Sequence, residues 1–267
     1  MNEAALFPAL LMGIVEGLTE FLPISSTGHL ILLETLIGFR GPPGKVFEIS
    51  IQLGAILAVV WVYRALLLDL ALNFWRGRRE RLYVVNLALA FLPAAIIGAT
   101  LHGTITELLF NPWVVSVALI LGGAVIIAIE RERPEPRIHS VPEIGPLAAL
   151  LVGFGQALAM IPGTSRSGAT IITALLVGAD RRTAAEFSFV LAIPTMLAAT
   201  VYSLFKARHE LDTAGLGEIA VGFVAAFILA LLTVRWLLSV IGRIGFTPFG
   251  WYRIALGTLM LLVLALG

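Results

Sequence analysis

The sequence predicts an all-α integral membrane protein with six transmembrane helices plus two re-entrant helix-break-helix hairpins, arranged as an inverted-topology repeat. Three observations support this prediction. The 267 residues are 59% hydrophobic and only 13% charged, whereas soluble globular domains have about 25% charged residues. Continuous apolar stretches occur at regular intervals along the chain. Two further apolar regions are interrupted by similar polar segments, which suggests a duplicated unit.

Six apolar windows are long enough to cross about 30 Å of hydrocarbon, which takes roughly 20 helical residues. They cover residues 46–64, 82–101, 113–129, 184–205, 216–238 and 249–266. The two other apolar regions, 4–38 and 144–178, are interrupted by "FLPISSTGH" and "MIPGTSRSGAT". Each half of these regions is short for a span, and a break facing lipid would leave backbone groups without hydrogen bonds. We therefore expect two re-entrant hairpins, each buried in protein or lining a wet cavity.

The two interrupted regions are related by a constant offset. Gly153 and Gly168 bracket the second polar segment as Gly13 and Gly28 bracket the first, 140 residues earlier. Each copy then contains one hairpin and three crossings, and an odd number of crossings inserts the second copy upside down. The chain is thus expected to be a single polytopic membrane domain, 1–267, built of two repeats, 1–130 and 144–267.

Basic residues give an independent test of this topology. If hairpins return to the side they entered, one face of the membrane holds eleven arginines: Arg64, Arg76, Arg78, Arg79, Arg81, Arg131, Arg133, Arg137, Arg181, Arg182 and Arg243. The opposite face holds Arg40, Lys45, Lys206 and Arg208. Because cytoplasmic loops are rich in Lys and Arg, the arginine-rich face should be cytoplasmic and both termini should lie outside. The two hairpins would then enter from opposite sides, and their polar tips would meet near the midplane.

Composition also excludes several classes of function. The net charge is +1 and the longest basic run is the short "RGRRER" at 76–81, so we expect no nucleic-acid partner. The absence of cysteine excludes disulfides, thiolate metal sites and a thiol nucleophile. The N-terminal stretch lacks a basic region and a small-residue cleavage site, so no removable signal peptide is expected.

The first polar tip contains ionisable groups that are rare in membranes. Glu16 and Glu20 are four residues apart, so on a helix they share a face and can hold one divalent cation or one proton between them. His29 follows nearby. Each ionisable side chain at the centre of a bilayer costs roughly 2.5 to 3.5 kcal/mol, which favours a functional role over a merely internal polar network.

The same tip resembles the start of a helix. Pro23 should end the preceding helix, and Ser25, Ser26 and Thr27 are suitable N-caps for the next. Because a helix N-terminus offers free N–H groups and partial positive charge, this is a site for phosphate. The alternative is that the hydroxyls only cap the helix. His29 should lie one turn inside this helix, near Ser26.

The second tip repeats the design with the opposite charge. Pro162 should end one half-helix, and Thr164 or Ser165 can cap the next. Arg166 would lie in its first turn, where a cation opposes the helix dipole unless an anion also binds. Guanidinium suits bidentate phosphate contact. The alternative is a structural ion pair with one of the two glutamates. Together the tips suit a phosphorylated ligand whose remainder is apolar.

These residues carry a resemblance. "EGLTEFLPISSTGH" and "PGTSRSGAT" closely resemble the two motifs of the bacterial undecaprenyl-pyrophosphate phosphatase family, also known for bacitracin resistance, and the resemblance covers essentially the whole chain. It implies hydrolysis of undecaprenyl pyrophosphate to the monophosphate carrier lipid of peptidoglycan synthesis, in the bacterial inner membrane. It also implies a divalent cation as cofactor, Mg²⁺ or Ca²⁺. The expected partners are the polyprenyl pyrophosphate and the membrane, and a homodimer is left open.

The resemblance also implies roles for individual residues. The expected catalytic residues are Ser26, His29, Glu20 and Arg166; the phosphate-binding residues are Thr27, Ser165, Arg166, Ser167 and Thr170; the metal ligands are Glu16 and Glu20. Three attacking groups remain open: Ser26 with His29 as its base, His29 itself through a phosphohistidine, or a water activated by His29 or Glu20. The spacing of serine three residues before histidine favours the first.

A transporter is the competing functional class. Inverted repeats with broken helices that meet at the midplane are a transporter architecture. One arginine and two helix termini would also bind an anionic lipid head group without cleaving it. The two functions are compatible, because a phosphatase of this architecture could also move its product between leaflets.

Overall fold

The computed structural model describes residues 3–39, 46–207 and 215–266. Within these ranges the chain is helical, and the only strand-like pairing is an isolated bridge between Ile138 and Ala179. The α-helices are α1 (Glu3–Thr19), α2 (Ser26–Ile37), α3 (Val46–Val62), α4 (Arg64–Asn73), α5 (Arg78–Leu109), α6 (Pro112–Glu132), α7 (Pro146–Leu158), α8 (Arg166–Leu176), α9 (Arg181–Ala207), α10 (Leu216–Ile244) and α11 (Thr247–Leu266). A short 3₁₀ helix, η2 (Val141–Glu143), precedes α7. The predicted all-α class is confirmed.

Five of these helices are long and apolar enough to cross a membrane: α5, α6, α9, α10 and α11. They contain the last five of the six predicted spans. The first predicted span, 46–64, corresponds to α3, which would give a sixth crossing if counted together with α4. The described residues therefore contain five or six candidate membrane spans.

The segment after α3, which lies between two predicted spans, contains the additional helix α4. The two helices are bent by 70° relative to each other, and the break falls at Tyr63. The predicted basic run, "RGRRER", overlaps the start of α5. Neither proline nor glycine lies at this bend, and the apolar pattern of 64–73 is too short to predict a further span.

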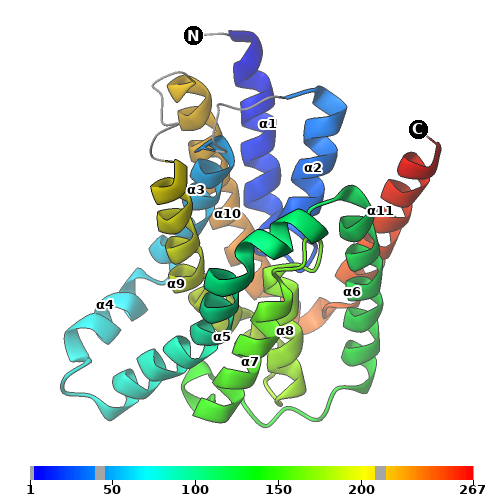
Figure 1. Ribbon diagram of the computed structural model, residues 1–267. Helices are drawn as coiled ribbons and strands as arrows, with labels where there is room; N and C mark the ends of the chain where they lie inside the picture. The colour runs from blue at the N-terminus through cyan, green and yellow to red at the C-terminus, as the bar shows by residue number, and fades with distance from the viewer. Residues whose placement is uncertain (1–2, 40–45, 208–214, 267) are drawn as a thin grey trace.

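Two short helix pairs flank the centre of the molecule. α1 packs against α2, and α7 packs against α8. In Figure 1 both turns lie near the middle of the structure, and the pairs open toward opposite ends. The first opens toward the end where both chain termini lie, and the second toward the other end.

Glycines allow close approach of these pairs to longer helices. A Cβ on Gly13 of α1 would overlap the backbone of Gly222 in α10. A Cβ on Gly153 of α7 would come within 2.6 Å of the carbonyl oxygen of Ala90 in α5. Small residues at helix interfaces are the usual way to pack helices tightly in a membrane. The two glycines predicted to be equivalent thus make equivalent contacts with different helices.

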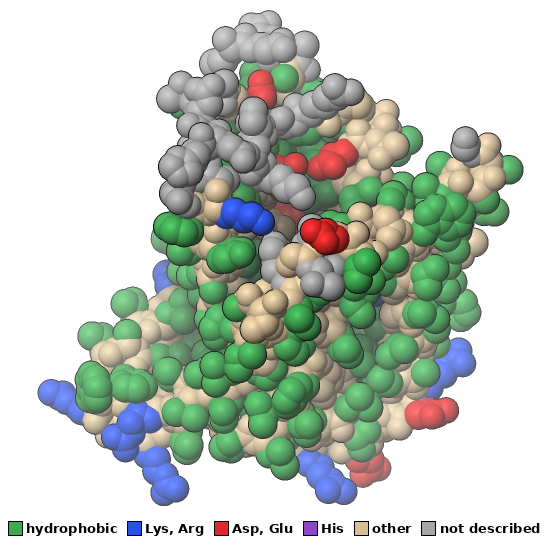
Figure 2. Space-filling model, viewed as in Figure 1, with side chains coloured by type: hydrophobic (Ala, Val, Ile, Leu, Met, Phe, Trp, Pro, Cys, Tyr) green, Lys and Arg blue, Asp and Glu red, His purple; other side chains and the backbone are tan. Residues whose placement is uncertain are grey.

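Basic side chains gather mainly at the end of the molecule opposite the termini. Figure 2 shows most of the visible Lys and Arg at the lower end, whereas the sides are covered by apolar side chains. Arg40, Lys45 and Arg208, predicted for the other end, lie outside the described residues. An apolar belt with charge at one end is the surface expected of a multi-pass membrane protein.

Candidate active site

The first tip is a strained turn between α1 and α2. α1 ends at Thr19, four residues before Pro23, and the chain turns through 20–25. Ser25 is the residue before α2 and has φ 69° and ψ 94°, a left-handed region that disfavours residues with a Cβ. Ser25 was among the predicted N-caps, but its side chain makes no capping hydrogen bond. Residues held in such regions cost about 1–3 kcal/mol each and cluster at functional sites.

The second tip repeats this backbone. Ser165 precedes α8 with φ 73°, and it follows Ser25 by the predicted offset of 140 residues. The oxygen of its side chain accepts a hydrogen bond from the backbone N–H of Gly168 at 3.1 Å, so the predicted cap is confirmed here. Ser25 and Ser165 are the only residues other than glycine with positive φ in the described part of the chain.

The two tips meet, and Glu20 is the point of contact. The Nη2 of Arg166 lies 3.2 Å from Glu20 Oε1, and Arg166 Nη1 donates to the carbonyl oxygen of Ser188 at 3.2 Å. Ser26 Oγ donates to the other carboxylate oxygen, Oε2, at 2.5 Å. The two side chains of the ion pair are only 12% and 10% exposed. A hydroxyl, a carboxylate and a guanidinium thus form one connected chain across the two tips.

A second contact joins the backbones of the tips. Ser167 Oγ donates to the carbonyl oxygen of Leu22 at 2.8 Å. The ring of Phe21 lies beneath the Arg166 guanidinium, with its centroid 5.6 Å from Cζ, and packs edge-on against Phe189. The ion pair therefore lies over a buried aromatic floor, where charge interactions are screened less than in water.

Glu16 lies one helical turn before Glu20 and is fully buried. Neither of its carboxylate oxygens has a hydrogen-bond partner among the described residues. A buried carboxylate without partners is strongly unfavourable unless it binds a proton or a cation. No cluster of three or more His, Cys, Asp or Glu side chains suited to a metal occurs within the described ranges. Any cation here would rely on the two glutamates together with water or substrate oxygens.

The hydrogen bonds of the His29 ring go to groups other than the Ser26 hydroxyl. Its Nδ1 lies 2.7 Å from the carbonyl oxygen of Ser25, and its Nε2 lies 2.7 Å from the hydroxyl of Tyr252 in α11. The serine–histidine pairing favoured by the spacing is therefore not the arrangement found, because Ser26 donates to Glu20 instead. Thr27, also in the first turn of α2, is partly exposed and makes no side-chain hydrogen bond within the described part of the chain.

The hydroxyls of the second tip are buried and bonded to protein. Ser167 and Thr170 are fully buried and Ser165 nearly so. Thr170 Oγ1 lies 2.6 Å from Ser188 Oγ, and the Ser165 and Ser167 hydroxyls lie 3.1 Å apart. Thr170 also donates to the carbonyl oxygen of Arg166. These groups hold the first turn of α8 in shape, and only Arg166 is partly open to a ligand.

Sequence reasoning missed Arg253, which is fully buried in α11. Its guanidinium donates to five carbonyl oxygens: Pro23 in the first tip, Gly163 and Thr164 in the second, and Ala118 and Leu119 in α6. Helix breaks leave carbonyls without intrahelical partners, and Arg253 supplies donors to carbonyls of both breaks at once. The available signal was one arginine inside the predicted span 249–266.

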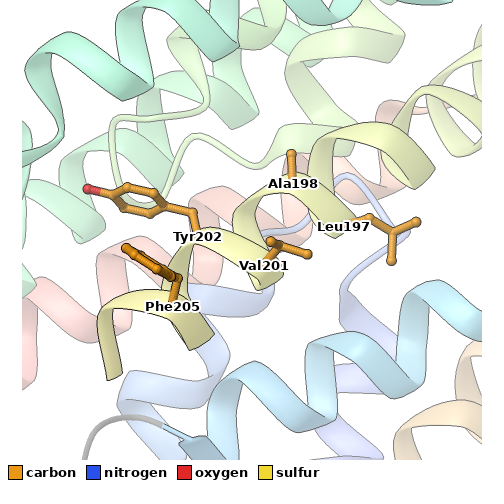
Figure 3. Close-up of a pocket in the computed structure, with 5 residues that line it drawn as sticks. All are labelled: Leu197, Ala198, Val201, Tyr202 and Phe205. Carbon is orange, nitrogen blue, oxygen red and sulfur yellow. The ribbon is translucent and has the colours of Figure 1, made fainter. Parts of the chain in front are cut away.

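A shallow, open apolar depression of about 540 Å³ lies along the second half of α9. Figure 3 shows its lining, and all the labelled side chains come from that helix: Leu197, Ala198, Val201, Tyr202 and Phe205. It contains none of the predicted site residues. Its walls suit a hydrocarbon chain and offer little for a phosphate.

Comparison with known proteins agrees with these features. The family model described as "Bacitracin resistance protein BacA" matches residues 9–259. A protein of Paramagnetospirillum magneticum named "Undecaprenyl-diphosphatase 2" is 54% identical over 94% of this chain and 96% of its own length. Proteins named "Undecaprenyl-diphosphatase" from Parvibaculum lavamentivorans and Dechloromonas aromatica are 50% and 53% identical, over 100% and 98% of this chain and 99% and 95% of their own lengths.

Proposed function

Because the chain belongs to the bacitracin resistance protein BacA family, we propose that it hydrolyses undecaprenyl pyrophosphate to undecaprenyl phosphate and inorganic phosphate. Relatives named for this activity match along nearly their whole length. The reaction recycles the carrier lipid for peptidoglycan synthesis, and the family name connects it with bacitracin resistance. A charged site between apolar helices suits a substrate with a pyrophosphate head and a hydrocarbon tail.

The hydrogen-bonded chain Ser26–Glu20–Arg166 carries the mechanistic proposal. Ser26 Oγ attacks the terminal phosphorus of the pyrophosphate, and its proton passes to the carboxylate of Glu20. The bond between that phosphorus and the bridging oxygen breaks, and undecaprenyl phosphate leaves with the electron pair. Water then attacks the phosphorus of the phosphoserine, the bond from phosphorus to Ser26 Oγ breaks, and Glu20 returns its proton to that oxygen, which releases inorganic phosphate and restores the hydroxyl. We assign the base to Glu20 and not to His29, because Glu20 accepts the hydrogen bond from the Ser26 hydroxyl.

Arg166 stabilises the negative charge on the phosphoryl group during transfer. Its position in the first turn of α8 adds the free N–H groups and positive dipole of that helix end. Direct phosphate contact by Ser165, Ser167 and Thr170 stays a prediction, and their burial supports a role in shaping the turn that presents Arg166. Thr27, which lies next to Ser26, stays the other predicted phosphate contact.

A divalent cation, Mg²⁺ or Ca²⁺, fits Glu16 and Glu20 in part. The buried, unpartnered carboxylate of Glu16 supports this site, and Mg²⁺ commonly takes one or two protein carboxylates plus water and substrate phosphates. When bound, the cation would neutralise charge on the pyrophosphate. A cation at this position would give the Glu16 carboxylate the partner it lacks while Glu20 is engaged by Arg166.

The test is phosphate release from undecaprenyl pyrophosphate by purified protein in detergent, with and without EDTA. The wild type should release phosphate in a metal-dependent reaction, and Ser26→Ala should lose at least about a thousandfold in kcat while staying folded, as expected for loss of a nucleophile. Substrate labelled on the terminal phosphate should give a phosphoenzyme that survives acid and is cleaved by alkali. An acid-labile phosphoenzyme would instead identify His29, and full activity of Ser26→Ala without any phosphoenzyme would identify water.

Lipid transport is the second candidate function. The proposed inverted repeat supports it: α1 packs against α10 as α7 packs against α5, and the extensive contact of α3 with α10 corresponds to a much smaller contact of α9 with α5. These contacts exchange the two proposed halves, 1–130 and 144–267. Movement of labelled lipid across vesicles by a catalytically inactive variant supports a carrier activity, and absence of movement there limits the protein to hydrolysis.

The proposed location is the bacterial inner membrane, with both termini outside. The gathering of basic residues at the end opposite the termini supports this orientation. Because the sequence lacks cysteine, single-cysteine variants give a clean test. Arg79→Cys should react with an impermeant thiol reagent only after the cytoplasmic side is opened, and Leu266→Cys should react from outside. The reverse labelling pattern contradicts the orientation. A homodimer stays a prediction.

A further inference from the structure

The ring of His29 makes two hydrogen bonds of the same length, and neither goes to the other members of the proposed site. One joins Nδ1 to the carbonyl oxygen of Ser25 at 2.7 Å. The other joins Nε2 to the hydroxyl of Tyr252 at 2.7 Å, and the two rings lie nearly in parallel planes, 2° apart. Tyr252 was not singled out by the sequence.

These partners fix which nitrogen carries the proton. A carbonyl oxygen can only accept, so Nδ1 must carry the hydrogen of that bond. In neutral His29 the Nε2 atom is then an acceptor, and the Tyr252 hydroxyl donates to it. Both nitrogens are therefore occupied, and the free lone pair that a base for Ser26 would need is already taken by Tyr252.

The histidine bond acts on the strained residue of the first tip. The carbonyl that accepts from Nδ1 belongs to Ser25, whose φ of 69° starts α2 and directs the next residue, Ser26. The backbone N–H of His29 reaches the same carbonyl only at 3.4 Å, a weak contact. Because the Ser25 side chain makes no cap, the ring of His29 supplies the short bond that holds this turn.

Tyr252 is next in sequence to Arg253, whose hydrogen bonds fix this part of α11. Arg253 anchors α11 to the carbonyls of both tips, so the position of Tyr252 is set by the same breaks that form the site. Within the described residues α2 packs mainly against α1 and α6, and its contacts with α11 are sparse. Ile31 and Leu32 of α2 pack against a small apolar cluster that includes Met260 of α11, and the Tyr252 hydroxyl adds a directional hydrogen bond between the two helices.

We propose that Tyr252 is a positioning residue for the hydrolysis, acting through His29 to hold the Ser25 turn so that Ser26 Oγ points at Glu20. This inference rests on the proposed role of Ser26. In this proposal His29 orients the attacking serine, and its Nε2 accepts the hydrogen bond from the Tyr252 hydroxyl. A shift of Ser26 by a fraction of an ångström lengthens its 2.5 Å bond to Glu20 and slows the attack.

The experiment removes only the hydroxyl with Tyr252→Phe, which keeps the ring and its packing. We expect kcat for phosphate release from undecaprenyl pyrophosphate to fall about 10- to 100-fold, the scale of effects from misplaced groups, with KM changed less than about threefold. Trp251→Phe, at an exposed neighbouring aromatic of the same helix, should keep kcat within about twofold, as surface substitutions usually do.

A double-mutant cycle tests whether Tyr252 acts through His29. In a His29→Ala background, Tyr252→Phe should change kcat by less than about twofold, because the link is already lost. The same loss in both backgrounds, or a wild-type kcat for Tyr252→Phe, overturns the proposal. If His29→Ala is too slow to measure, the ¹⁵N resonance of His29 Nε2 decides: it should move in Tyr252→Phe, and an unchanged resonance overturns the proposal.

This outcome is separable from the proposed attack by Ser26. If Ser26→Ala stays active, the serine mechanism fails whatever Tyr252→Phe does. If Ser26→Ala is inactive and Tyr252→Phe behaves like wild type, the serine mechanism stands and only the role of Tyr252 fails.

Discussion

The two tips share a backbone and differ in chemistry. Each has a serine with positive φ directly before a helix, Ser25 in the first and Ser165 in the second. At the following position the first tip has Ser26 and the second has Arg166. The Ser26 hydroxyl and the Arg166 guanidinium therefore bond to opposite oxygens of the same carboxylate, that of Glu20. A duplicated strained turn can thus supply two different functional groups to one site, because the turn sets the position and the side chain sets the chemistry.

The tips also differ in how their backbones are held. Ser165 caps its own helix through Gly168, and its hydroxyl neighbours Ser167. Ser25 makes no such bond, and its carbonyl is held by His29. The strained serine of the second tip is therefore held by its own side chain, whereas the carbonyl of Ser25 is held by His29, which is itself bonded to Tyr252 of α11. The serine proposed as the nucleophile follows the residue that has no cap of its own.

The largest expected effect removes the charge that distinguishes the second tip. Arg166→Ala should lower kcat by about a thousandfold or more, since an arginine at a transferring phosphoryl group contributes on this scale. Arg166→Lys should recover little, because lysine cannot bond Glu20 and the Ser188 carbonyl with a planar fork. Phosphate release by purified variants measures both.

Arg182→Ala is the matched control, because that arginine forms an exposed pair with Glu186 on α9. It should keep activity within about twofold, as expected for a surface pair. Near-normal activity of folded Arg166→Ala would show that the contact between the tips is structural only.

The next largest effect is expected from Arg253, whose hydrogen bonds stabilise both tips. Arg253→Lys keeps the charge but has three donors for five carbonyl oxygens. Each buried carbonyl left without a donor costs about 1–3 kcal/mol. We expect a clearly lower unfolding temperature in detergent and a loss of activity that exceeds the loss of folded protein. Arg235→Lys, at an exposed position of α10, should leave both unchanged, and equal behaviour of the two variants contradicts the role of Arg253.

The sequence predicted the pairing of the tips because it rests on repeated local signals. Proline, serine and glycine marked both breaks, and the parity of crossings placed the tips together, so that Glu20 and Arg166 could be named as neighbours. Glu16 was likewise recognised as a carboxylate in an apolar region. The fully buried, unpartnered state of Glu16 could be seen only in the structure.

Long-range partners could not be predicted. Arg253 and Pro23 are 230 positions apart, and a single arginine in an apolar span gives no information about which carbonyls it will meet. The hydrogen-bond partner of Ser26 depends on the same kind of information: helical spacing favoured His29 among the three alternatives left open, whereas the hydroxyl donates to Glu20 in the structure. Local periodicity predicts which residues share a helix face and says nothing of how a break redirects them.

A smaller effect distinguishes the two strained serines directly. Glycine adopts positive φ without strain, so Ser25→Gly should raise stability or leave it unchanged, with a gain of up to about 1 kcal/mol. Ser165→Gly gains the same relief but loses the cap to Gly168 and the contact with Ser167, so it should be no more stable than wild type. Thermal unfolding of both variants in one detergent gives the comparison. Equal shifts would mean that the two turns are held alike.

The smallest effect concerns the connection that leads into the second hairpin. Glu143 in η2 accepts hydrogen bonds from the backbone N–H of His139 at 2.8 Å and from Ser140 Oγ at 2.7 Å. These bonds, the backbone one first, lower the pKa of the Glu143 carboxyl below its usual value. A lowered pKa means that the ionised form stabilises this turn above the usual glutamate pKa of about 4.3, and that the effect is lost as pH falls through the lower value in the folded protein.

Glu143→Gln should therefore reduce hydrogen-exchange protection of residues 137–144 at neutral pH and have no effect at low pH. Glu135→Gln, at an exposed carboxylate of the same connection, should leave this protection unchanged at both neutral and low pH. Loss of protection that persists at low pH would assign the effect to the shape of the side chain and not to its charge.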